Sequence, residues 1–508
     1  MKLQKKSLIS AFLILVLATG YVLAQEEDTG NLGEELILIE GSDDQGAEGT
    51  ILIEDSSPQQ SDVIIIESQT GNEGAIEPES STDVILEPDS PGLRGTETGN
   101  ETAKTQGPKV LDIGIDELWF EDSFLTKRSE TVNTLDYGHL AFSAVWDISP
   151  QWEARLAGRL DGYRQTGTPD MTDFDLDYDE SYLRYRNESL RVTLGAQKVI
   201  WGRIDEIPPT DRLSTPDLTR FILDDLADRR RARLMVRAEY FNGNNKLDLF
   251  VLPAFREAKL PDTDSIWYPI DRRRGKILGL ETSPAFAVAM ATAKIVEDAP
   301  NSDGGIGLRF SRTEGSFDYA VTLQRGRQTI PYFIYDGAAN SFTTVYPRSN
   351  SVGFDLGFEY AGYVWRFETA AQDVVPVTQA DLSYTEVVGA KWAAGMEFFP
   401  GDGNNRVNLQ LAGNHLLNTP SGIRERERLY NLNGAVEIPF AEDRWRANIR
   451  FFLGLNQEDV YLNPEIAFLG WEPHEFYLEN HYFSGDEGSL GGFHEGHSMI
   501  SVGWRVKL

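Results

Sequence analysis

The chain ends in Ile500-Ser-Val-Gly-Trp-Arg-Val-Lys-Leu508, and this stretch decides how the rest of the sequence is interpreted. Apolar side chains occupy every second position from Ile500 to Leu508, while Ser, Gly, Arg and Lys fill the positions between them. Successive side chains of a β-strand point to opposite faces, so this alternation predicts a strand with one apolar and one wet face. A soluble β-sandwich could contain one such strand, so the pattern has to be followed along the chain.

Runs of about ten residues with the same alternation recur from residue 108 onward, together with many aromatic residues. In each run one face is apolar and the other carries charged or amide side chains. Strands that place one face against lipid and the other around a wet interior have this pattern. We therefore expect an all-β fold for residues 108–508, a transmembrane antiparallel β-barrel. The clearest runs are Leu190–Ala196, Leu234–Tyr240, Val352–Tyr360, Val407–Leu411 and Trp445–Leu455.

Short turns such as Ala361-Gly362 alternate with longer links between these runs, as they do in outer-membrane barrels. Nine long links predict about 18 strands, with both chain ends on the same side. The runs Val110–Phe120 and Val460–Phe468 are weak, which leaves about 16 strands as the alternative. The longest links are Trp201–Arg230, Ala254–Gly304 and Arg327–Ser349.

The first 24 residues have the organisation of a secretory signal peptide. Lysines cluster at the start, an apolar core runs from Leu8 to Leu17, and Val22-Leu-Ala24 resembles a cleavage site with small residues. We therefore expect residues 1–24 to direct the protein to the periplasm. The barrel is then expected in the outer membrane of a Gram-negative cell.

Residues 25–107 differ in composition from both neighbours. They contain 21 acidic and 2 basic side chains and no Phe, Tyr or Trp. Such a segment buries too little apolar surface to offset the entropy of ordering, so we expect a disordered acidic tail in the periplasm. Four short β-branched bursts in it each end in an acid, and their final pairs are Ile39-Glu40, Ile53-Glu54, Ile66-Glu67 and Leu86-Glu87.

These repeated bursts suit docking to partner proteins. An extended peptide can add a strand to the edge of a sheet with alternate side chains in pockets, and several weak copies on one tether raise avidity. The alternative is a charged spacer in which the apolar bursts have no role.

Composition and motifs exclude several functions. The chain has no cysteine, which rules out disulfides, thiolate metal sites and c-type haem attachment. Its net charge of −33 argues against nucleic acid as a partner. It has no phosphate loop, nucleophile elbow or metalloprotease motif, so we expect no catalytic residues, no cofactor and no metal. A metal ion between His494 and His497 is the weaker alternative.

The long link after Gln197 is the best candidate for a functional site. Thr215 and Pro216 favour the start of a helix, and an apolar stripe then precedes an arginine cluster, so we expect a helix up to Arg231. Folded into the barrel, this link would narrow the lumen. Its acids Asp205, Glu206 and Asp211 would then face basic residues such as Arg203, Arg212 and the cluster Arg272-Arg-Arg274. The candidate constriction residues are Trp201, Arg203, Asp205, Asp211, Asp217, Arg229, Arg230 and Arg231, with a second basic cluster, Arg272, Arg273 and Arg274.

Two other interpretations of these residues stay open. Trp201 could belong to the aromatic girdle at the membrane interface. The arginine clusters could bind phosphates of lipopolysaccharide or be solvated. The wall of the lumen is mixed in charge, which predicts a polar path without naming its solute. The basic residues expected to line it are Arg155, Arg159, Arg191, Arg237, Arg366, Lys391, Arg446 and Arg450.

Part of this region resembles an uncharacterised family of Gram-negative outer-membrane barrels. The similarity is carried by Leu194-Gly-Ala-Gln-Lys-Val-Ile-Trp-Gly-Arg-Ile-Asp205, by Asp211-Arg-Leu-Ser-Thr-Pro-Asp217, and by Arg233 and Tyr240. Ser214-Thr215-Pro216 departs from the compact Asn-Pro that is usual in the family. The plan is also similar to that of alginate-export porins. The resemblance implies a barrel that works beside an RND-type exporter.

We therefore expect an outer-membrane, porin-like channel for passage or export of a small or polymeric solute. Its tail is expected to dock a periplasmic or inner-membrane exporter component. Outer-membrane lipid, lipopolysaccharide and the barrel assembly machinery are the other expected partners. A tethering barrel with a plugged lumen is the alternative, and a hydrolase embedded in the barrel is the third possibility.

Overall fold

A computed structural model describes residues 111–127, 131–401 and 403–508 of the chain. The expected signal peptide, the acidic tail and its four hydrophobic-Glu pairs lie outside these described residues. Everything below therefore concerns the barrel region.

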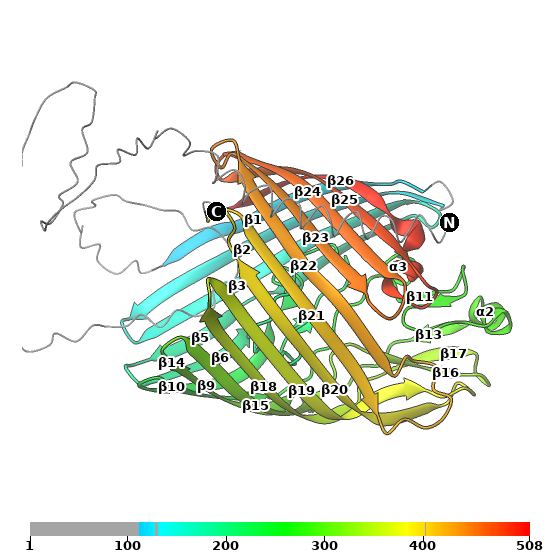
Figure 1. Cartoon of the computed structure of the whole chain (residues 1–508), viewed down its shortest axis with the longest axis horizontal. Coiled ribbons are helices and arrows are strands. Elements are labelled where there is room, and N and C mark those ends of the chain that lie inside the picture. Colours follow the sequence, from blue (N-terminus) through cyan, green and yellow to red (C-terminus); the bar gives the residue numbers. More distant parts are fainter. Residues whose placement is uncertain (1–110, 128–130, 402) are drawn as a thin grey trace, which may run out of the picture. The chain divides into compact units, whose positions relative to one another are not determined.

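The described chain forms one large antiparallel sheet that closes on itself, because β1 pairs with β26 (Figure 1). The sheet contains 19 strands. Of these, β4 and β5 pair with successive parts of β3 and so occupy one position in the barrel wall. The barrel therefore has 18 strand positions. Its strands are β1 (Asp112–Leu125), β2 (Val132–Ser149), β3 (Trp152–Gly167), β4 (Met171–Tyr178), β5 (Ser181–Arg186), β6 (Leu190–Gln197), β9 (Arg233–Asn242), β10 (Asn245–Leu252), β14 (Gly305–Glu314), β15 (Phe317–Arg327), β18 (Arg348–Tyr360), β19 (Tyr363–Thr378), β20 (Tyr384–Phe398), β21 (Arg406–Leu417), β22 (Arg428–Phe440), β23 (Trp445–Gly454), β24 (Asp459–Trp471), β25 (His474–Gly485) and β26 (Met499–Lys507).

The alternation seen in the sequence separates the two faces of the wall. On β10, the outward Leu247, Leu249 and Val251 are 40–42 % exposed, whereas the inward Asp248 and Phe250 are each 2 % exposed. Apolar side chains thus cover the outside and polar ones face inward, as in a lipid-embedded barrel. The expected barrel fold and the count of 18 are confirmed. The two weak runs are real strands, β1 and β24, so the 16-stranded alternative is wrong.

The two ends of the barrel differ as the sequence predicted. At one end, the short-turn end, hairpins join neighbouring strands. At Ala361-Gly362 both turn residues have positive φ, 55° and 77°, which matches the twist of a tight hairpin. At the other end, the long-loop end, the links are longer.

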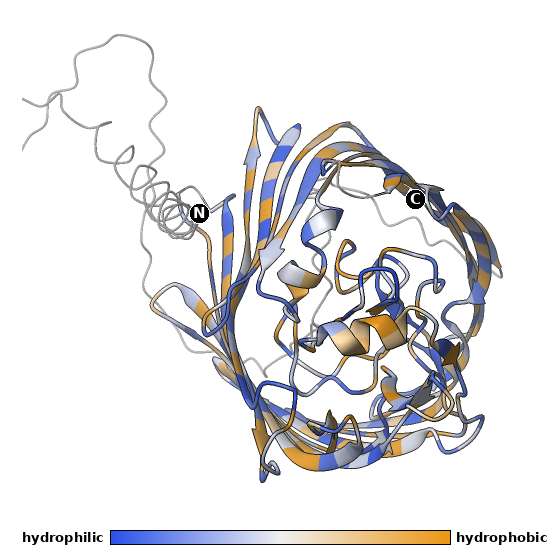
Figure 2. Cartoon of the chain, turned by 90° about the vertical axis from the view of Figure 1, so that its right-hand side faces the viewer, coloured by the Kyte–Doolittle hydropathy of each residue, from blue (hydrophilic) through white to orange (hydrophobic). Residues whose placement is uncertain are grey.

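The links at the long-loop end contain structure of their own, and Figure 2 shows folded segments across this opening. The short strands β13, β17 and β16 pair into a separate small sheet. Among the described residues, no helix is long and apolar enough to cross a membrane. The elements outside the barrel wall are β7 (Thr215–Pro216), β8 (Arg230–Arg231), β11 (Ile270–Asp271), β12 (Lys276–Ile277), α2 (Pro284–Met290), β13 (Lys294–Val296), β16 (Tyr332–Asp336), β17 (Ser341–Val345), α3 (Leu490–Phe493) and the 3-10 helix Glu495–His497.

Candidate functional site

The link between β6 and β9, residues 198–232, folds inside the barrel and is called the lumenal insertion below. It has two parts, a first limb of residues 198–212 and a second limb of residues 217–229. β7 lies between the two limbs and pairs with β8, which follows the second limb. This two-residue ladder closes the base of the second limb. The insertion contacts strands on opposite walls, as the following paragraphs describe.

The helix expected up to Arg231 is wrong, because residues 217–229 form a series of turns. Phe221 has a positive φ of 56°, which interrupts any helix. The carbonyl groups of Ile222, Leu223 and Asp224 accept hydrogen bonds from the barrel residue Arg450. Contacts with the wall thus replace the hydrogen bonds that a helix would make within itself.

Glu368 on β19 holds the first limb to the wall. Its carboxylate accepts hydrogen bonds from the backbone N–H groups of Arg203, Ile204 at 2.7 Å and Thr210 at 3.2 Å. The hydroxyl of Thr210 donates a fourth, at 2.8 Å. Glu368 is 3 % exposed, so these bonds are shielded from water. Hydrogen bonds to a charged group stabilise by about 1.5–3 kcal/mol each, which makes this one side chain the main anchor of the limb.

Two charged side chains of the first limb extend the attachment to neighbouring strands. Arg203 donates from Nε to Asp355 of β18 at 2.6 Å. Asp205 accepts from Asn408 of β21 and lies 3.7 Å from Arg406 and 3.9 Å from Arg366. The first limb therefore lies along the wall formed by β18, β19, β20 and β21.

Glycines on this wall make room for the limb. A Cβ at Gly353 would lie 2.9 Å from the Cγ2 of Thr210, and one at Gly395 would lie 3.1 Å from the Cδ1 of Ile204. At Gly357 the nearest atom is the Cδ of Arg203, at 3.4 Å. Larger side chains at the first two positions would push the limb toward the barrel axis.

Trp201 lies inside the barrel, and its placement in a membrane-interface girdle is wrong. It is 2 % exposed and packs in a cluster with Leu213, Met235 and Phe250. Its indole N–H donates to Asp248 of β10 at 3.1 Å. The residue thus fixes the start of the insertion to the β9–β10 wall.

The base of the insertion is held by ion pairs that the expected constriction residues make. Asp211 lies 3.1 Å from Arg230, Arg229 lies 3.7 Å from Glu206, and Arg231 lies 2.9 Å from Asp177 of β4. Asp217 accepts from Thr219 at 2.6 Å and lies 3.9 Å from Arg159 of β3.

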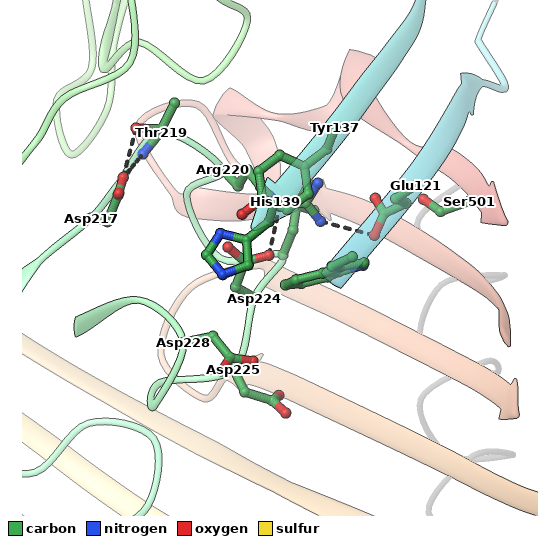
Figure 3. Close-up of polar contacts among 12 residues, drawn as sticks. Glu121, Tyr137, His139, Asp217, Thr219, Arg220, Asp224, Asp225, Asp228 and Ser501 are labelled. Atoms are coloured by element: carbon green, nitrogen blue, oxygen red, sulfur yellow. Dashed lines mark hydrogen bonds and ion pairs between the residues drawn. The ribbon is translucent and has the colours of Figure 1, made fainter. Parts of the chain in front are cut away.

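The second limb reaches the opposite wall through Arg220 (Figure 3). This guanidinium lies 2.9 Å from Glu121 of β1 and 2.7 Å from Asp224. It also lies over the rings of Tyr137 and Trp119, 4.1 and 4.9 Å from their centroids. Arg220 is only 7 % exposed, and ion pairs and cation–π contacts to β1 and β2 thus surround its guanidinium.

Arg450 and Arg505 complete the attachment of the second limb. Arg450 of β23 lies 2.7 Å from Asp225 and also binds three backbone carbonyls of the limb. Arg505 of β26 lies 2.7 Å from Asp228. Burial alone would raise the pKa of Asp228, but Arg505 and Lys507 lower it below its usual value, so this carboxylate is charged.

Apolar packing joins the second limb to the links between strands at the long-loop end, which are called the external links below. Leu223 belongs to a buried cluster with Trp267, Tyr461, Phe483 and other side chains from the long-loop end. Phe221 stacks on Trp267, with ring centroids 6.2 Å apart. The second limb is therefore part of a hydrophobic core at the long-loop end. The first limb has apolar contacts of its own at Trp201 and Ile204, and polar contacts hold the rest of it.

The expected pairing of Asp205, Glu206 and Asp211 with the second basic cluster is wrong. Arg272, Arg273 and Arg274 lie in the external link between β10 and β14. There they bind the carbonyl of Ala293, the carbonyl of Thr168 and the carboxylate of Asp271, respectively. They link external segments to one another, because the insertion already has partners on the wall.

The basic residues expected to line the lumen all face inward. Seven of the eight lie within 4.0 Å of a carboxylate, and Lys391 is the exception within the described residues. The pairs are Arg155–Asp116 at 3.3 Å, Arg159–Asp161 at 2.7 Å, Arg191–Glu239 at 3.6 Å, Arg237–Asp248 at 2.7 Å, Arg366–Glu397 at 2.5 Å, Arg446–Glu465 at 3.2 Å and Arg450–Asp225 at 2.7 Å.

Glu368 and Arg220 help to hold the insertion in place, yet neither stands out in the sequence as an anchor. Glu368 sits in an ordinary alternating strand, and nothing local shows that a loop 158 residues earlier binds it. The glycines at 353, 357 and 395 are the one usable signal, because inward glycines close together on the wall indicate that another segment packs against it.

No group of three or more His, Asp or Glu side chains in the described ranges is arranged to hold a metal ion. His494 and His497 are both buried and contact each other, with their Nδ1 atoms 2.9 Å apart. The contact between the two rings engages the Nδ1 atom of each.

The closed wall of 18 antiparallel strands, the apolar exterior and the ion-paired interior define the class of this protein. It is an outer-membrane β-barrel with a porin-like plan, in which one link between strands folds into the lumen.

The sequence matches no protein-family model and no curated protein. Among solved structures, the chain is similar to OccAB3 of Acinetobacter baumannii, at 9% identity and a TM-score of 0.44, over 78% of this chain and 98% of that one. OccD3 of Pseudomonas aeruginosa has 7% identity and a TM-score of 0.43, over 79% and 93% of the two chains. OmpF of Salmonella typhi, in complex with daunomycin, has 10% identity and a TM-score of 0.41, over 78% and 97%. At these identities no site residue carries over to this chain.

Proposed function

We propose that this protein is an outer-membrane channel for small polar solutes, and that its lumenal insertion forms the constriction. The observation that carries the proposal is the position of the insertion. Its first limb is bound to β18, β19 and β21, and its second limb to β23 and, across the barrel, to β1 and β26. A segment held to opposite walls narrows any path through the lumen.

The chemistry of the lumen supports a polar solute. Its wall carries charged side chains of both signs, most of them in ion pairs, so it offers a hydrogen-bonding path to water and small hydrophilic molecules. A wide polymer is disfavoured as cargo, because the insertion and the external links both occupy the route.

Releasing the first limb tests the proposal. Glu368→Gln removes the charge that four hydrogen bonds share, so we expect single-channel conductance in planar bilayers to rise as the limb detaches. Thr210→Val removes one of these bonds and should have a smaller effect in the same direction. The matched control is Glu437→Gln, an inward carboxylate on β22. If Glu368→Gln conducts like the unaltered protein, the first limb is not the constriction.

A plugged, tethering barrel is the second candidate, and one observation favours it. The second limb packs into a buried apolar cluster with Trp267 and Phe483, which closes part of the opening. Swelling of liposomes in sugars or amino acids decides between the two functions. A channel admits these solutes, and a plugged barrel excludes them.

We also propose, from the sequence alone, that residues 25–107 dock an exporter component through the hydrophobic-Glu pairs. Full-length protein should capture a periplasmic or inner-membrane partner. A variant with Ile39, Ile53, Ile66 and Leu86 replaced by Ser should not. Equal capture by the two proteins would show that the segment is a spacer.

A further inference from the structure

Lys391 differs from the other inward-facing residues of β20. Val387, Gly389, Ala393, Gly395 and Glu397 all face inward and are buried, whereas Lys391 is exposed. Its neighbours in the wall are small or polar, since it lies opposite Ala370 of β19 and Asn414 of β21. Solvent therefore reaches Lys391 inside the barrel, which marks an open part of the lumen beside the insertion.

A second cation, Arg212, lies at the end of the first limb. Thr210, two residues before it, lies against Gly353 of β18. Gly353, Ala370 and Lys391 occupy one row across three adjacent strands, so Gly353, where the first limb meets the wall, lies about 10 Å from Lys391. The two charges act on each other.

Neither cation has an ion-pair partner among the described residues. The Nη1 atom of Arg212 is buried without a hydrogen-bond partner. Burial lowers the pKa of Arg212 to about 10, and Asp373 offsets this only in part. Asp373 itself binds the backbone and side chain of Asn350. An unpaired buried cation is costly, and a second cation nearby adds to that cost.

We infer that Arg212 and Lys391 form a subsite for small anions in the lumen, so that the channel prefers solutes carrying a carboxylate or a phosphate. The other seven basic residues expected to line the lumen are already paired with protein carboxylates, and at this place a solute supplies the missing negative charge. Oxyanions fit both donors, because a guanidinium binds two oxygens at once and an ammonium acts as a point charge. The inference rests on the proposed channel function.

Reversal potentials in a gradient of potassium chloride test the subsite. We expect the unaltered protein to favour chloride over potassium. Lys391→Gln should reduce the ratio of chloride to potassium permeability by about fourfold. A positive charge roughly 10 Å from a passing ion attracts chloride and repels potassium, so its loss changes both permeabilities. Lys391→Glu should reverse the preference, and Arg212→Gln should act like Lys391→Gln. The control is Lys294→Gln, an exposed lysine on β13 with the same loss of charge.

The outcomes separate this inference from the proposed function. A protein that conducts, but whose selectivity is the same in all these variants, has no anion subsite at Arg212 and Lys391. A protein that does not conduct at all overturns the channel itself. Block of the conductance by inorganic phosphate, weakened in Lys391→Gln but not in Lys294→Gln, would show directly that the site binds an oxyanion.

Discussion

The two limbs of the lumenal insertion are attached to the barrel in different ways. The first limb is held mainly by the carboxylate of Glu368, which binds backbone N–H groups, and it lies on glycines of the wall. The second limb is held by buried arginines and also shares an apolar core with the external links. One side chain, Glu368, thus makes four hydrogen bonds to residues 203–210 of the first limb, whereas no single side chain has that share in the second attachment.

This difference suggests separate roles for the limbs. Residues 203–210 depend on the polar contacts of Glu368 and have little core packing of their own, so this part of the first limb is suited to set or vary the width of the path. A segment packed in a core with Trp267 detaches only when that core opens. The second limb is thus suited to a fixed plug that closes one side of the lumen.

The largest effect is expected at Trp267. Trp267→Ala removes an aromatic side chain that is 5 % exposed from the core that the second limb shares, so unfolding free energy should fall by about 3–5 kcal/mol. Unfolding in urea measures this value. Trp201→Phe, on the first limb, keeps most of the packing and loses the bond to Asp248, so it should cost only about 1 kcal/mol. Equal decreases in unfolding free energy for the two variants would contradict the proposed difference between the limbs.

An intermediate effect is expected at Glu368. Glu368→Gln should lower the unfolding free energy by about 2 kcal/mol, because the charged acceptor of four hydrogen bonds is lost. Limited proteolysis should then cut the first limb and spare the second. Cleavage of both limbs at the same rate would contradict their independence.

Lowering the pH should reduce the stability of the second limb and of the buried histidines that pack beside it. Burial first, and then the charges of His497 and Arg274, hold the pKa of His494 well below its usual value. The pKa of His497 is lowered in the same way. Neutral rings are thus favoured in the folded state, so stability is complete above the unfolded pKa of about 6.5 and falls as pH drops below it, by about 1.4 kcal/mol per pH unit for each ring.

Urea midpoints at pH 7.5 and 5.5 measure this dependence. His494 contacts Phe221 of the second limb, with ring centroids 4.6 Å apart, so acid should loosen that limb first. His497→Gln should reduce the dependence on pH. A midpoint that rises on acidification would contradict the assignment.

The smallest effect is expected at an exposed ion pair. Arg312 and Glu314 lie 2.9 Å apart near the short-turn end, and their side chains are 38% and 63% exposed. Glu314→Gln should change the unfolding free energy by less than about 0.5 kcal/mol and leave both limbs unaffected.

The barrel could be predicted from the sequence because alternation is a local property. Each run, such as Ile500–Leu508, shows its two faces without reference to any other strand. The insertion was harder, because its conformation depends on partners far away in the chain. Residues 217–229 have the composition of a capped helix, but hydrogen bonds from Arg450 and the core with Trp267 stabilise turns instead. Tertiary contacts override helix propensity at this site.

Charged residues of the insertion were easier to recognise than anchors on the wall, although Arg220 of the insertion was missed and Arg450 of the wall was found. Asp205, Asp211 and Arg230 stand out in a charged link between strands. Glu368 does not, since an inward acid is ordinary in a wet barrel. The assignment of Arg272, Arg273 and Arg274 failed because charge alone does not show which of two loops a cluster will bind.

The central claim is that the first limb, held by Glu368, sets the width of the path, and a reversible lock tests it most directly. A Cβ at Gly353 would lie 3.4 Å from the Cβ of Thr210, close to the roughly 3.8 Å of a disulfide, and the chain has no other cysteine. Thr210→Cys with Gly353→Cys can therefore be combined with Glu368→Gln. We predict low conductance in the oxidised protein and a reversible rise on reduction. The same conductance in the oxidised and reduced states would contradict the account.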